Sequence, residues 1–344
     1  MENYKEGDQL ADISYIIPTF NNLALLKKCL HTLLPETVKG DKVIIVDDGG
    51  SDGTYEYLLE TYKEDSRFII LHQENQGQGV ARNLGLQHAV TEYVWFVDSD
   101  DLLVEGARRK VKGILDTNKW DILIFDYNVK KSRTEIKNVS LKLKYLDYRE
   151  LMFTDHFPWN KIFRKELFGK VTFPKEKIRF QDHGTIPKLI IKASHINYLN
   201  EPLYQYDLSH ETNVSKNEKL YDHMYIACNY LVDYFRDGGE VREGLEPLLI
   251  NTFLFNRMYS SRDVSFSERK REFMEMERYL NESIPGWQTS EYLDFSFWKK
   301  YHHMQHYTFV KLFNIKLFSR SPLAALLILH PFNSLKNSVK KIVR

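Results

Sequence analysis

The chain has 344 residues, 43% of them hydrophobic and 28% charged, which is long enough for two globular domains and excludes a largely disordered chain. Its two cysteines, Cys29 and Cys228, are too few and too far apart for a disulfide framework, which favours a reducing, cytoplasmic location. The formal net charge is +1, yet the stretch from Phe295 to Arg344 contains nine Lys or Arg and no Asp or Glu. A basic C-terminal stretch on an otherwise acidic chain favours an anionic surface as partner.

No segment has the pattern of a signal peptide or of a membrane span. Residues 1–12 are polar and acidic, unlike a signal peptide. The longest late apolar run, Leu323–Leu329, is far shorter than the ~20 residues that a membrane-spanning helix needs. We therefore expect no encoded membrane span.

Strand and helix patterns alternate over the first hundred residues. The segments between the apolar runs carry apolar residues at helical spacing, the first of them after Asn21-Asn22, which we expect to act as a helix N-cap. This alternation predicts an α/β fold with a doubly wound, mostly parallel sheet. The predicted buried strands are Ile13–Pro18, Val43–Val46, Phe68–Leu71, Val94–Val97 and, further on, Asp121–Phe125.

The fourth predicted strand ends in a cluster of carboxylates: Asp98, Asp100 and Asp101. Carboxylates at the end of a buried strand are costly unless something positive meets them, and in open α/β sheets ligands bind at that end. Mg²⁺ or Mn²⁺ with a phosphate-bearing ligand would satisfy them. The alternative is an acidic turn in which Asp101 caps the next helix before Leu102-Leu103. From this stretch alone both interpretations stay open.

The second predicted strand runs into a glycine-rich loop, Asp47–Thr54. Gly49, Gly50 and Gly53 permit positive φ or close backbone approach. No Gly-Lys-Ser/Thr ends the loop, and no Gly-x-Gly-x-x-Gly follows the first strand. Both an NTPase and a dinucleotide-binding protein therefore lose their main support.

In this order and spacing, four stretches resemble the nucleotide-sugar-binding half of the family 2 glycosyltransferases of bacterial cell-surface polysaccharide synthesis, which have the GT-A fold. The resemblance covers about residues 13–110 and continues more loosely to about 215. Each motif alone is weak, but four in order are specific. They are Pro18–Asn21, Val46–Gly49 with Ser51–Thr54, Asn75 with Gly77 and Ala81–Asn83, and Asp98–Asp100.

The resemblance implies a UDP-sugar donor and Mn²⁺ or Mg²⁺ as cofactor. Asp48 would accept a hydrogen bond from the base, or else cap the Gly49–Gly53 loop, a task that Asp52 can also perform. Arg82 would hold the diphosphate, or else form a surface salt bridge. Asp98 and Asp100 are the DxD pair that would hold the metal and so stabilise the leaving diphosphate. The donor-binding residues implied are Pro18, Thr19, Phe20, Asn21, Asp48, Asn75, Gly77, Arg82, Asp98, Ser99 and His210.

Asp182 matches the family's general base, which takes the proton of the acceptor hydroxyl as that oxygen attacks the anomeric carbon. The alternative is that Asp182 caps a helix from Thr185 to Ala193. Gln181 departs from the acidic residue usual in the family. This departure puts the acceptor contacts in doubt and is the feature that favours a non-catalytic site.

The acceptor-side residues implied are Trp159, Lys161, Gln181 and His183. Trp159 either stacks on a sugar or belongs to the core, and we expect it at the start of a helix. Lys161 either reaches a phosphate or is solvated, and His183 either assists Asp182 or is structural. His210 lies in the loop Tyr204–Ser215, which would close over the diphosphate.

From Leu220 onward the pattern is helical. His302, His303 and His306 favour a polar helix face over a metal site. Phe332–Arg344 has the pattern of a basic amphipathic helix and, with Phe309–Phe318, predicts a peripheral anchor on an anionic membrane. The alternatives are an oligomer interface and docking on the chain's own acidic part; nucleic acid is disfavoured because that part would repel it.

The sequence thus predicts a GT-A domain over 1–215, with a donor half at about 10–112 and an acceptor half at about 113–215, followed by a helical region over 216–344. We expect an inverting hexosyl- or N-acetylhexosaminyltransferase that moves a sugar to a glycan or lipid-linked saccharide at the inner face of the plasma membrane. Capsule, exopolysaccharide or teichoic-acid synthesis is the expected context, and a homo-oligomer is possible. The alternatives are a nucleotidyltransferase and a non-catalytic nucleotide- or glycan-binding module.

Overall fold

The structure, a computed structural model, describes residues 12–132, 134–210, 220–237, 242–259, 264–301 and 309–329. It divides into two compact units. The first consists of Met1–Leu141 and His156–Tyr230, and the second of Lys142–Asp155 and Leu231–Arg344. The expected division at residue 215 stays a prediction.

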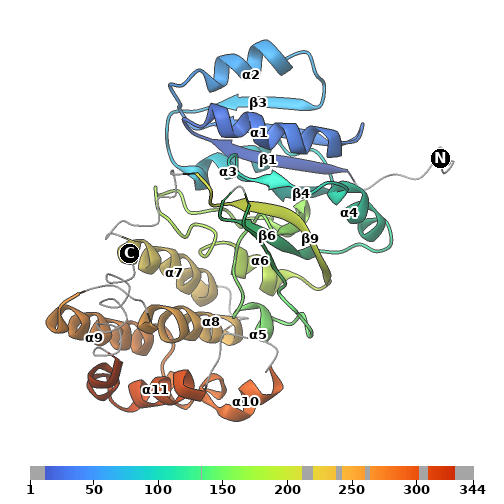
Figure 1. Cartoon of the computed structure of the whole chain (residues 1–344). Coiled ribbons are helices and arrows are strands. Elements are labelled where there is room, and N and C mark those ends of the chain that lie inside the picture. Colours follow the sequence, from blue (N-terminus) through green and yellow to red (C-terminus); the bar gives the residue numbers. More distant parts are fainter. Residues whose placement is uncertain are drawn as a thin grey trace. The chain divides into compact units, whose positions relative to one another are not determined.

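The first unit is built on a sheet of nine strands, counted over the part of the chain that the structure describes. Their order is β3-β2-β1-β4-β8-β6-β9-β5, and β7 pairs with β6 (Figure 1). The strands are β1 (Ile13–Thr19), β2 (Lys42–Asp47), β3 (Phe68–His72), β4 (Tyr93–Phe96), β5 (Leu102–Leu103), β6 (Ile122–Lys130), β7 (Ile136–Val139), β8 (Lys161–Arg164) and β9 (Ile196–Asp207).

The direction of these strands brings the carboxyl ends of β1, β2, β4, β6 and β9, together with that of β3, to one edge of the sheet. β1 is parallel to β2 and β4, whereas β8 is antiparallel to both β4 and β6. Since β8 is antiparallel to both of its neighbours, β6 runs in the same direction as β4. β9 is in turn parallel to β6. The ends of β1, β2, β4, β6 and β9 therefore meet at the edge where open α/β sheets bind ligands.

Helices cover both faces of this sheet. On β1, Tyr15 and Ile17 share a core cluster with residues of α1 (Leu23–Leu33) and α4 (Ala107–Leu115). Ile16 points to the other face because side chains alternate along a strand. There it meets α3 (Gln78–His88) so closely that a Cβ on Gly85 would come within 2.5 Å of the Ile16 side chain. The predicted doubly wound, mostly parallel sheet is confirmed; α2 (Thr54–Tyr62) and α6 (Ile186–Lys192) complete its helices.

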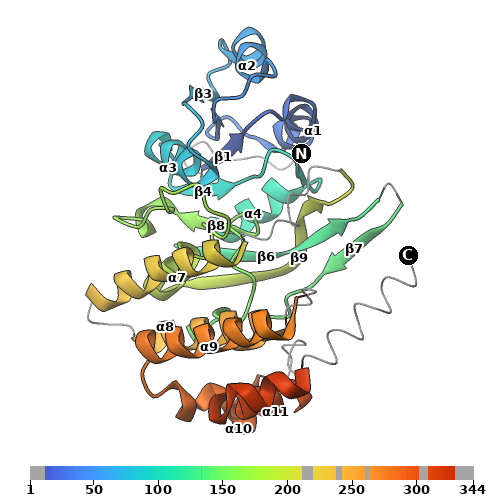
Figure 2. The same ribbon diagram turned by 90° about the vertical axis from the view of Figure 1, so that its left-hand side faces the viewer.

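The C-terminal region is helical, as predicted. Its helices are α7 (Leu220–Asp237), α8 (Arg242–Leu249), a π-helical stretch over Ile250–Asn256, α9 (Phe266–Ser283), α10 (Phe295–Lys300) and α11 (Phe309–Arg320), and the short α5 (Tyr148–Leu151) belongs to the same unit (Figure 2). Among the described residues, no helix is long and apolar enough to cross a membrane. The predicted polar histidines His302, His303 and His306 and the predicted amphipathic helix Phe332–Arg344 lie outside the described residues.

Two local expectations are wrong. Asn22 stands at the N-cap position of α1 but forms no side-chain cap; instead the Asp52 carboxylate accepts the Leu23 N–H at 2.9 Å. Trp159 leads into strand β8 and not into a helix. In both cases a segment distant in sequence decides the local structure. Asp52, from the loop after β2, accepts the N–H at the start of α1. The strands β4 and β6 pair with the residues after Trp159 and so make them strand β8.

Candidate active site

A small pocket opens at the carboxyl ends of β1, β2 and β4. Its volume is about 190 Å³. It takes side chains from three loops that are separated in sequence, and six of the predicted donor-binding residues line it. The lining residues are Pro18, Thr19, Phe20, Asn22, Asp48, Gln78, Asp98, Ser99 and Asp100.

Asp98 is held by an ion pair with Arg82 in a nearly dry setting. The Arg82 Nη2 donates to Asp98 Oδ1 at 2.6 Å, and the Arg82 residue is only 2% exposed. The alternative of a surface salt bridge for Arg82 is therefore wrong. Gln78 donates to the same Asp98 oxygen at 3.0 Å and accepts a hydrogen bond from Gln181 at 2.8 Å. Gln181 is thus buried and connected to the carboxylate cluster through Gln78.

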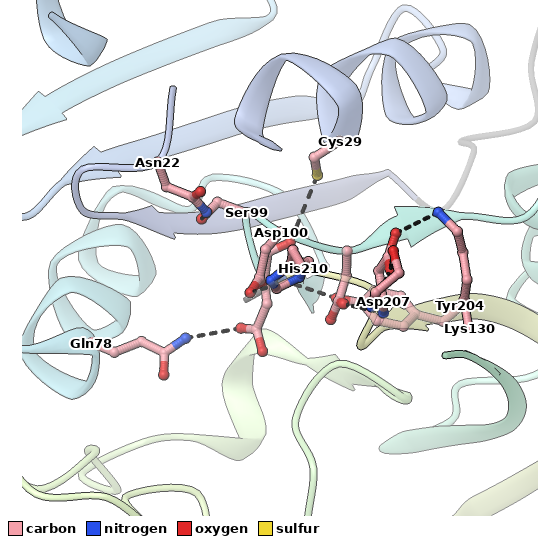
Figure 3. A network of polar contacts seen from close by, with 12 residues as sticks. Asn22, Cys29, Gln78, Ser99, Asp100, Lys130, Tyr204, Asp207 and His210 are labelled. Atoms are coloured by element: carbon pink, nitrogen blue, oxygen red, sulfur yellow. Dashed lines mark hydrogen bonds and ion pairs between the residues drawn. The ribbon is translucent and has the colours of Figure 1, made fainter. Parts of the chain in front are cut away.

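Asp101 does not cap a helix, which corrects the sequence prediction. Leu102-Leu103 form strand β5, and α4 begins only at Ala107. Asp101 is fully buried and accepts hydrogen bonds from the Tyr204 hydroxyl and the Asp207 N–H, both at 2.8 Å. The Tyr204 oxygen in turn accepts the Asp98 N–H at 3.0 Å, so Asp101 and Tyr204 tie the Asp98–Asp101 turn to β9 (Figure 3).

Asp100 is the partly exposed carboxyl of this turn whose pKa is raised. Burial, together with the negative charge of Asp98, raises the pKa of Asp100 to about 6, although His210 acts in the opposite direction. His210 lies with its Nε2 3.5 Å from Asp100 Oδ2 (Figure 3). A partly exposed carboxylate that resists ionisation in this way is suited to a cation.

The residues present fit a divalent cation that is only partly coordinated by protein. In the described part of the chain, no group of three or more His, Cys, Asp or Glu is placed to hold a metal ion. Mg²⁺, however, is commonly bound by one or two carboxylates, with substrate phosphates and water as the remaining ligands. Asp100 and the second oxygen of Asp98 can provide such a pair.

Asp48 organises the loop before α3. Its Oδ1 accepts from Gln73 Nε2 at 2.6 Å and from the Gln76 N–H at 2.9 Å, and its Oδ2 accepts the Gly77 N–H at 2.8 Å. Gly77 has a φ of 94°, which favours glycine. Asp48 therefore binds this loop and not the Gly49–Gly53 loop, while one side of the residue still lines the pocket.

Two pocket residues, Asn22 and Gln78, were not among the predicted site residues. Asn22 Nδ2 donates to Ser99 Oγ at 3.1 Å, which joins the end of β1 to the turn after β4 (Figure 3). The position of Asn22 directly after a buried strand was a usable signal for this role. Gln78 offered none, because its role depends on how α3 is placed against Asp98.

Asp182 keeps its side chain away from helix α6. The N–H groups of Thr185 and Ile186 bond to the backbone carbonyl of Asp182. Within the described part of the chain, Asp182 Oδ1 accepts a single hydrogen bond, from the adjacent His183 N–H at 2.9 Å. The predicted alternative of a side-chain N-cap is therefore wrong. Burial raises the pKa of Asp182, Arg82 lowers it and Asp98 raises it, which places this carboxyl in the electrostatic field of the turn after β4.

The backbone before Asp182 is in an unusual conformation. Phe180 has a φ of 65°, in the left-handed region that non-glycine residues seldom adopt. Asn21, after β1, has a φ of 47° and accepts the Ser51 N–H at 2.7 Å. Such conformations are often found at functional sites, and here they occur beside the candidate base and beside the pocket.

The remaining acceptor-side predictions have mixed outcomes. Trp159 is 3% exposed and stacked on Tyr204, as a core residue would be. Lys161 is 1% exposed and donates to Phe157 O and Asn160 Oδ1, so its solvated alternative is wrong. Burial lowers the pKa of His183 to about 4, and its Nδ1 lies 3.2 Å from that of His156.

The structure thus brings most of the predicted residues to one edge of the sheet. Asn21, Asn75, Gly77 and Arg82 do not line the small pocket, although they hold or flank the loops that do. The assignment of individual ligand contacts to these residues stays a prediction.

Comparisons with known proteins agree with this architecture. Residues 14–174 match the family model described as glycosyl transferase family 2. Over 211 residues the chain is 29% identical to a glycosyltransferase of Streptococcus pneumoniae serotype 4, GlyG, covering 56% of this chain and 70% of GlyG. It is 30% identical over 172 residues to the poly(ribitol-phosphate) beta-N-acetylglucosaminyltransferase TarP of Staphylococcus aureus, covering 49% and 52% of the two chains.

The fold is shared with a solved structure of similar length. A crystal structure of S. aureus TarS in complex with UDP-GlcNAc superposes with a TM-score of 0.68 at 20% identity, covering 90% of this chain and 91% of that one. The predicted GT-A fold with a helical C-terminal region is thereby confirmed. The stretch that matches the model of glycosyl transferase family 2 contains the pocket and the carboxylate turn.

Tyr204→Phe tests the connection between the turn and β9. We expect the free energy of unfolding to fall by about 1–3 kcal/mol, because the buried Asp98 N–H loses its acceptor and Asp101 loses a donor. Urea denaturation measures this change. Tyr15→Phe is the matched control: Tyr15 is also fully buried, but its hydroxyl has no hydrogen-bond partner among the described residues, so its removal should cost nothing. Equal losses in both variants would contradict the connection.

Asp100→Asn tests the raised pKa of Asp100. The folded state keeps the Asp100 proton up to about pH 6, whereas the unfolded chain releases it near 3.8, so wild-type stability should fall as the pH rises through this window. In metal-free buffer the variant should be more stable than wild type at about pH 8, with the difference vanishing below about pH 4.

Thermal melting across the pH range measures this difference. Asp65→Asn should show the opposite sign, because the hydrogen bonds from Arg67 lower the pKa of Asp65. An Asp100→Asn variant that is less stable than wild type above the window would contradict the interpretation.

Proposed function

We propose that this protein is an inverting glycosyltransferase that uses a UDP-sugar, with the nucleotide bound in the pocket at the ends of β1, β2 and β4. The observation that carries the proposal is that Asp98, which lines the pocket, and its partner Arg82 both act on the pKa of a separate carboxyl group, Asp182. A transferase needs both a place for the leaving group and a base for the acceptor.

The pocket has polar groups that remain available to a ligand. The Thr19 hydroxyl is buried and has no hydrogen-bond partner among the described residues, although Thr19 lines the pocket. Among the described residues, Asp48 Oδ2 accepts a single hydrogen bond, from the Gly77 N–H, so it can accept another from a uracil N–H. Phe20 is 47% exposed at the same rim and offers an aromatic surface to a base.

The proposed chemistry assigns the proton to Asp182. As the acceptor oxygen forms its bond to the anomeric carbon, Asp182 takes the hydroxyl proton and the bond from that carbon to the UDP oxygen breaks. A carboxyl whose pKa is raised by burial is a better base than an exposed one. Asp98 and Asp100 would hold the cation, which when bound neutralises charge on the departing diphosphate.

The relatives suggest where to begin the search for substrates. The TarS structure contains UDP-GlcNAc, and TarP is described as acting on poly(ribitol-phosphate). We therefore propose UDP-GlcNAc as the first donor to test. Poly(ribitol phosphate) and a lipid-linked saccharide extract are the first acceptors.

Asp182→Asn should abolish transfer and spare UDP binding. We expect UDP release to fall by about 10²- to 10⁴-fold, because an amide cannot accept the proton. Calorimetry should give a UDP dissociation constant within about twofold of wild type. The assay measures UDP released from a panel of UDP-sugars with Mn²⁺ or Mg²⁺, with and without each acceptor.

Controls separate this reading from the alternatives. Asp233→Asn, at an exposed position of α7, should leave both turnover and binding unchanged. Asp100→Ala should lower metal-dependent UDP release. Release of pyrophosphate in a parallel assay with UTP and a sugar 1-phosphate would indicate a nucleotidyltransferase. UDP binding without release from any sugar would indicate a binding module, and absence of UDP binding would refute the proposal.

The proposal extends to attachment on an anionic membrane. Within the C-terminal unit, Phe309, Val310 and Phe313 of α11 are 70%, 65% and 55% exposed. The Phe295 ring of α10 lies 6.0 Å from that of Phe309. No acidic residue occurs in the sequence after Asp294, and the described part of this stretch carries Lys299, Lys300, Lys311, Lys316 and Arg320, a composition that favours an anionic surface.

The double variant Phe309→Ser, Phe313→Ser tests this attachment. Flotation with vesicles of phosphatidylglycerol and phosphatidylcholine should show binding at least about tenfold weaker than wild type, since each buried phenylalanine contributes roughly 1.5–3 kcal/mol. Met274→Ser is the control, because Met274 is exposed on the more acidic surface of α9. Equal binding of wild type to pure phosphatidylcholine, or no effect of the double variant, would contradict the attachment.

A further inference from the structure

Tyr206 lies at the carboxyl end of β9, two residues after Tyr204. Side chains two apart on a strand point to the same face, so Tyr206 shares the face from which Tyr204 reaches the turn at Asp98 and Asp101. Tyr206 is partly exposed, whereas Tyr204 is fully buried. The strand therefore presents one anchoring tyrosine and, one pleat further toward the edge, one accessible tyrosine.

The Tyr206 ring packs against a stack of aromatic side chains. It lies 5.5 Å from the Trp159 ring at 25°. Trp159 stacks in turn on Tyr204, at 4.8 Å and 12°, and on Phe157, at 4.7 Å and 12°. Trp159 itself is too buried to meet a sugar, so the accessible surface of this stack belongs to Tyr206 and to the partly exposed Phe157.

The Tyr206 hydroxyl makes no hydrogen bond to the described residues. Burial raises the pKa of Tyr206 to about 12, and the further causes are the negative charges of Asp101, Asp98, Asp100 and Asp182. The side chain is thus within electrostatic range of both the proposed cation ligands and the proposed base.

The sheet order decides which substrate Tyr206 can meet. The nucleotide pocket takes its residues from the ends of β1, β2 and β4 and from α3, and Tyr206 is not among them. In the order β2-β1-β4-β8-β6-β9, the strand that bears Tyr206 lies on the other side of the β4 carboxylates. A group bound there meets the donor sugar from the side opposite to the nucleotide.

We propose that Tyr206 is a contact for the acceptor saccharide, with its ring against the C–H face of a sugar and its hydroxyl bonded to a sugar hydroxyl. An aromatic ring with a polar tip fits such an amphipathic ligand. The inference rests on the proposed function and adds a residue that sets acceptor affinity, a role that the sequence suggested for Trp159.

The test separates acceptor from donor effects. Tyr206→Ala should raise the acceptor KM at least about tenfold while the UDP dissociation constant and the release of UDP to water without acceptor stay within about twofold of wild type. Tyr206→Phe keeps the ring and loses only the hydroxyl, so its acceptor KM should lie between those of wild type and Tyr206→Ala. The acceptor is whichever of poly(ribitol phosphate) and the lipid-linked saccharide extract raises UDP release by wild type.

Tyr198→Phe is the matched control on the same strand, eight residues earlier and roughly 17 Å away by the register with β6, and should leave the acceptor KM unchanged. Thermal melting verifies that each variant is folded. An unchanged acceptor KM in Tyr206→Ala, or a parallel loss of UDP binding and of UDP release to water, overturns this inference alone. A wild-type protein that binds UDP but responds to no acceptor overturns the proposed function together with it.

Discussion

The rest of the site depends on one electrostatic constraint: four carboxyl groups share a poorly hydrated edge of the sheet with one buried arginine. Asp98, Asp100, Asp101 and Asp182 come from two loops, and Arg82 forms an ion pair with only the first. Burying carboxylates without partners is costly. The structure resolves this by giving each group a different environment.

These different environments suit the four carboxyl groups to different roles. Asp98 has Arg82 and Gln78, and Asp101 is fixed by Tyr204 and the Asp207 N–H. Asp100 is left with a raised pKa beside the pocket, and Asp182 with a side chain that caps nothing. Two carboxyls thus support the architecture, while two stay available, one for a cation and one for a proton. Pairs of carboxyls in unequal environments are how enzymes separate such roles.

Gln181 illustrates how the constraint shapes a departure from the family pattern. An acidic residue at this position would add a fifth carboxyl next to Asp182. The amide instead donates to Gln78, which donates to Asp98, so it joins the two loops without adding charge. Its buried position removes it from the acceptor surface. The feature that favoured a decayed site is therefore also consistent with a working one.

The sequence by itself determined the fold class and the location of the site. Unbroken apolar runs that end in Asp, Asn and Gly identify buried parallel strands and their ligand-binding edge, because both signals are local. Tertiary structure alone decided what Asp101, Trp159 and Lys161 do, and it alone brought Gln78 and Tyr206 to the site. Gln78 depends on how α3 is placed against Asp98. The other roles depend on β8 and β9, which pair with strands far away in the chain, and burial and hydrogen bonding across such pairings leave no periodic pattern in the residues themselves.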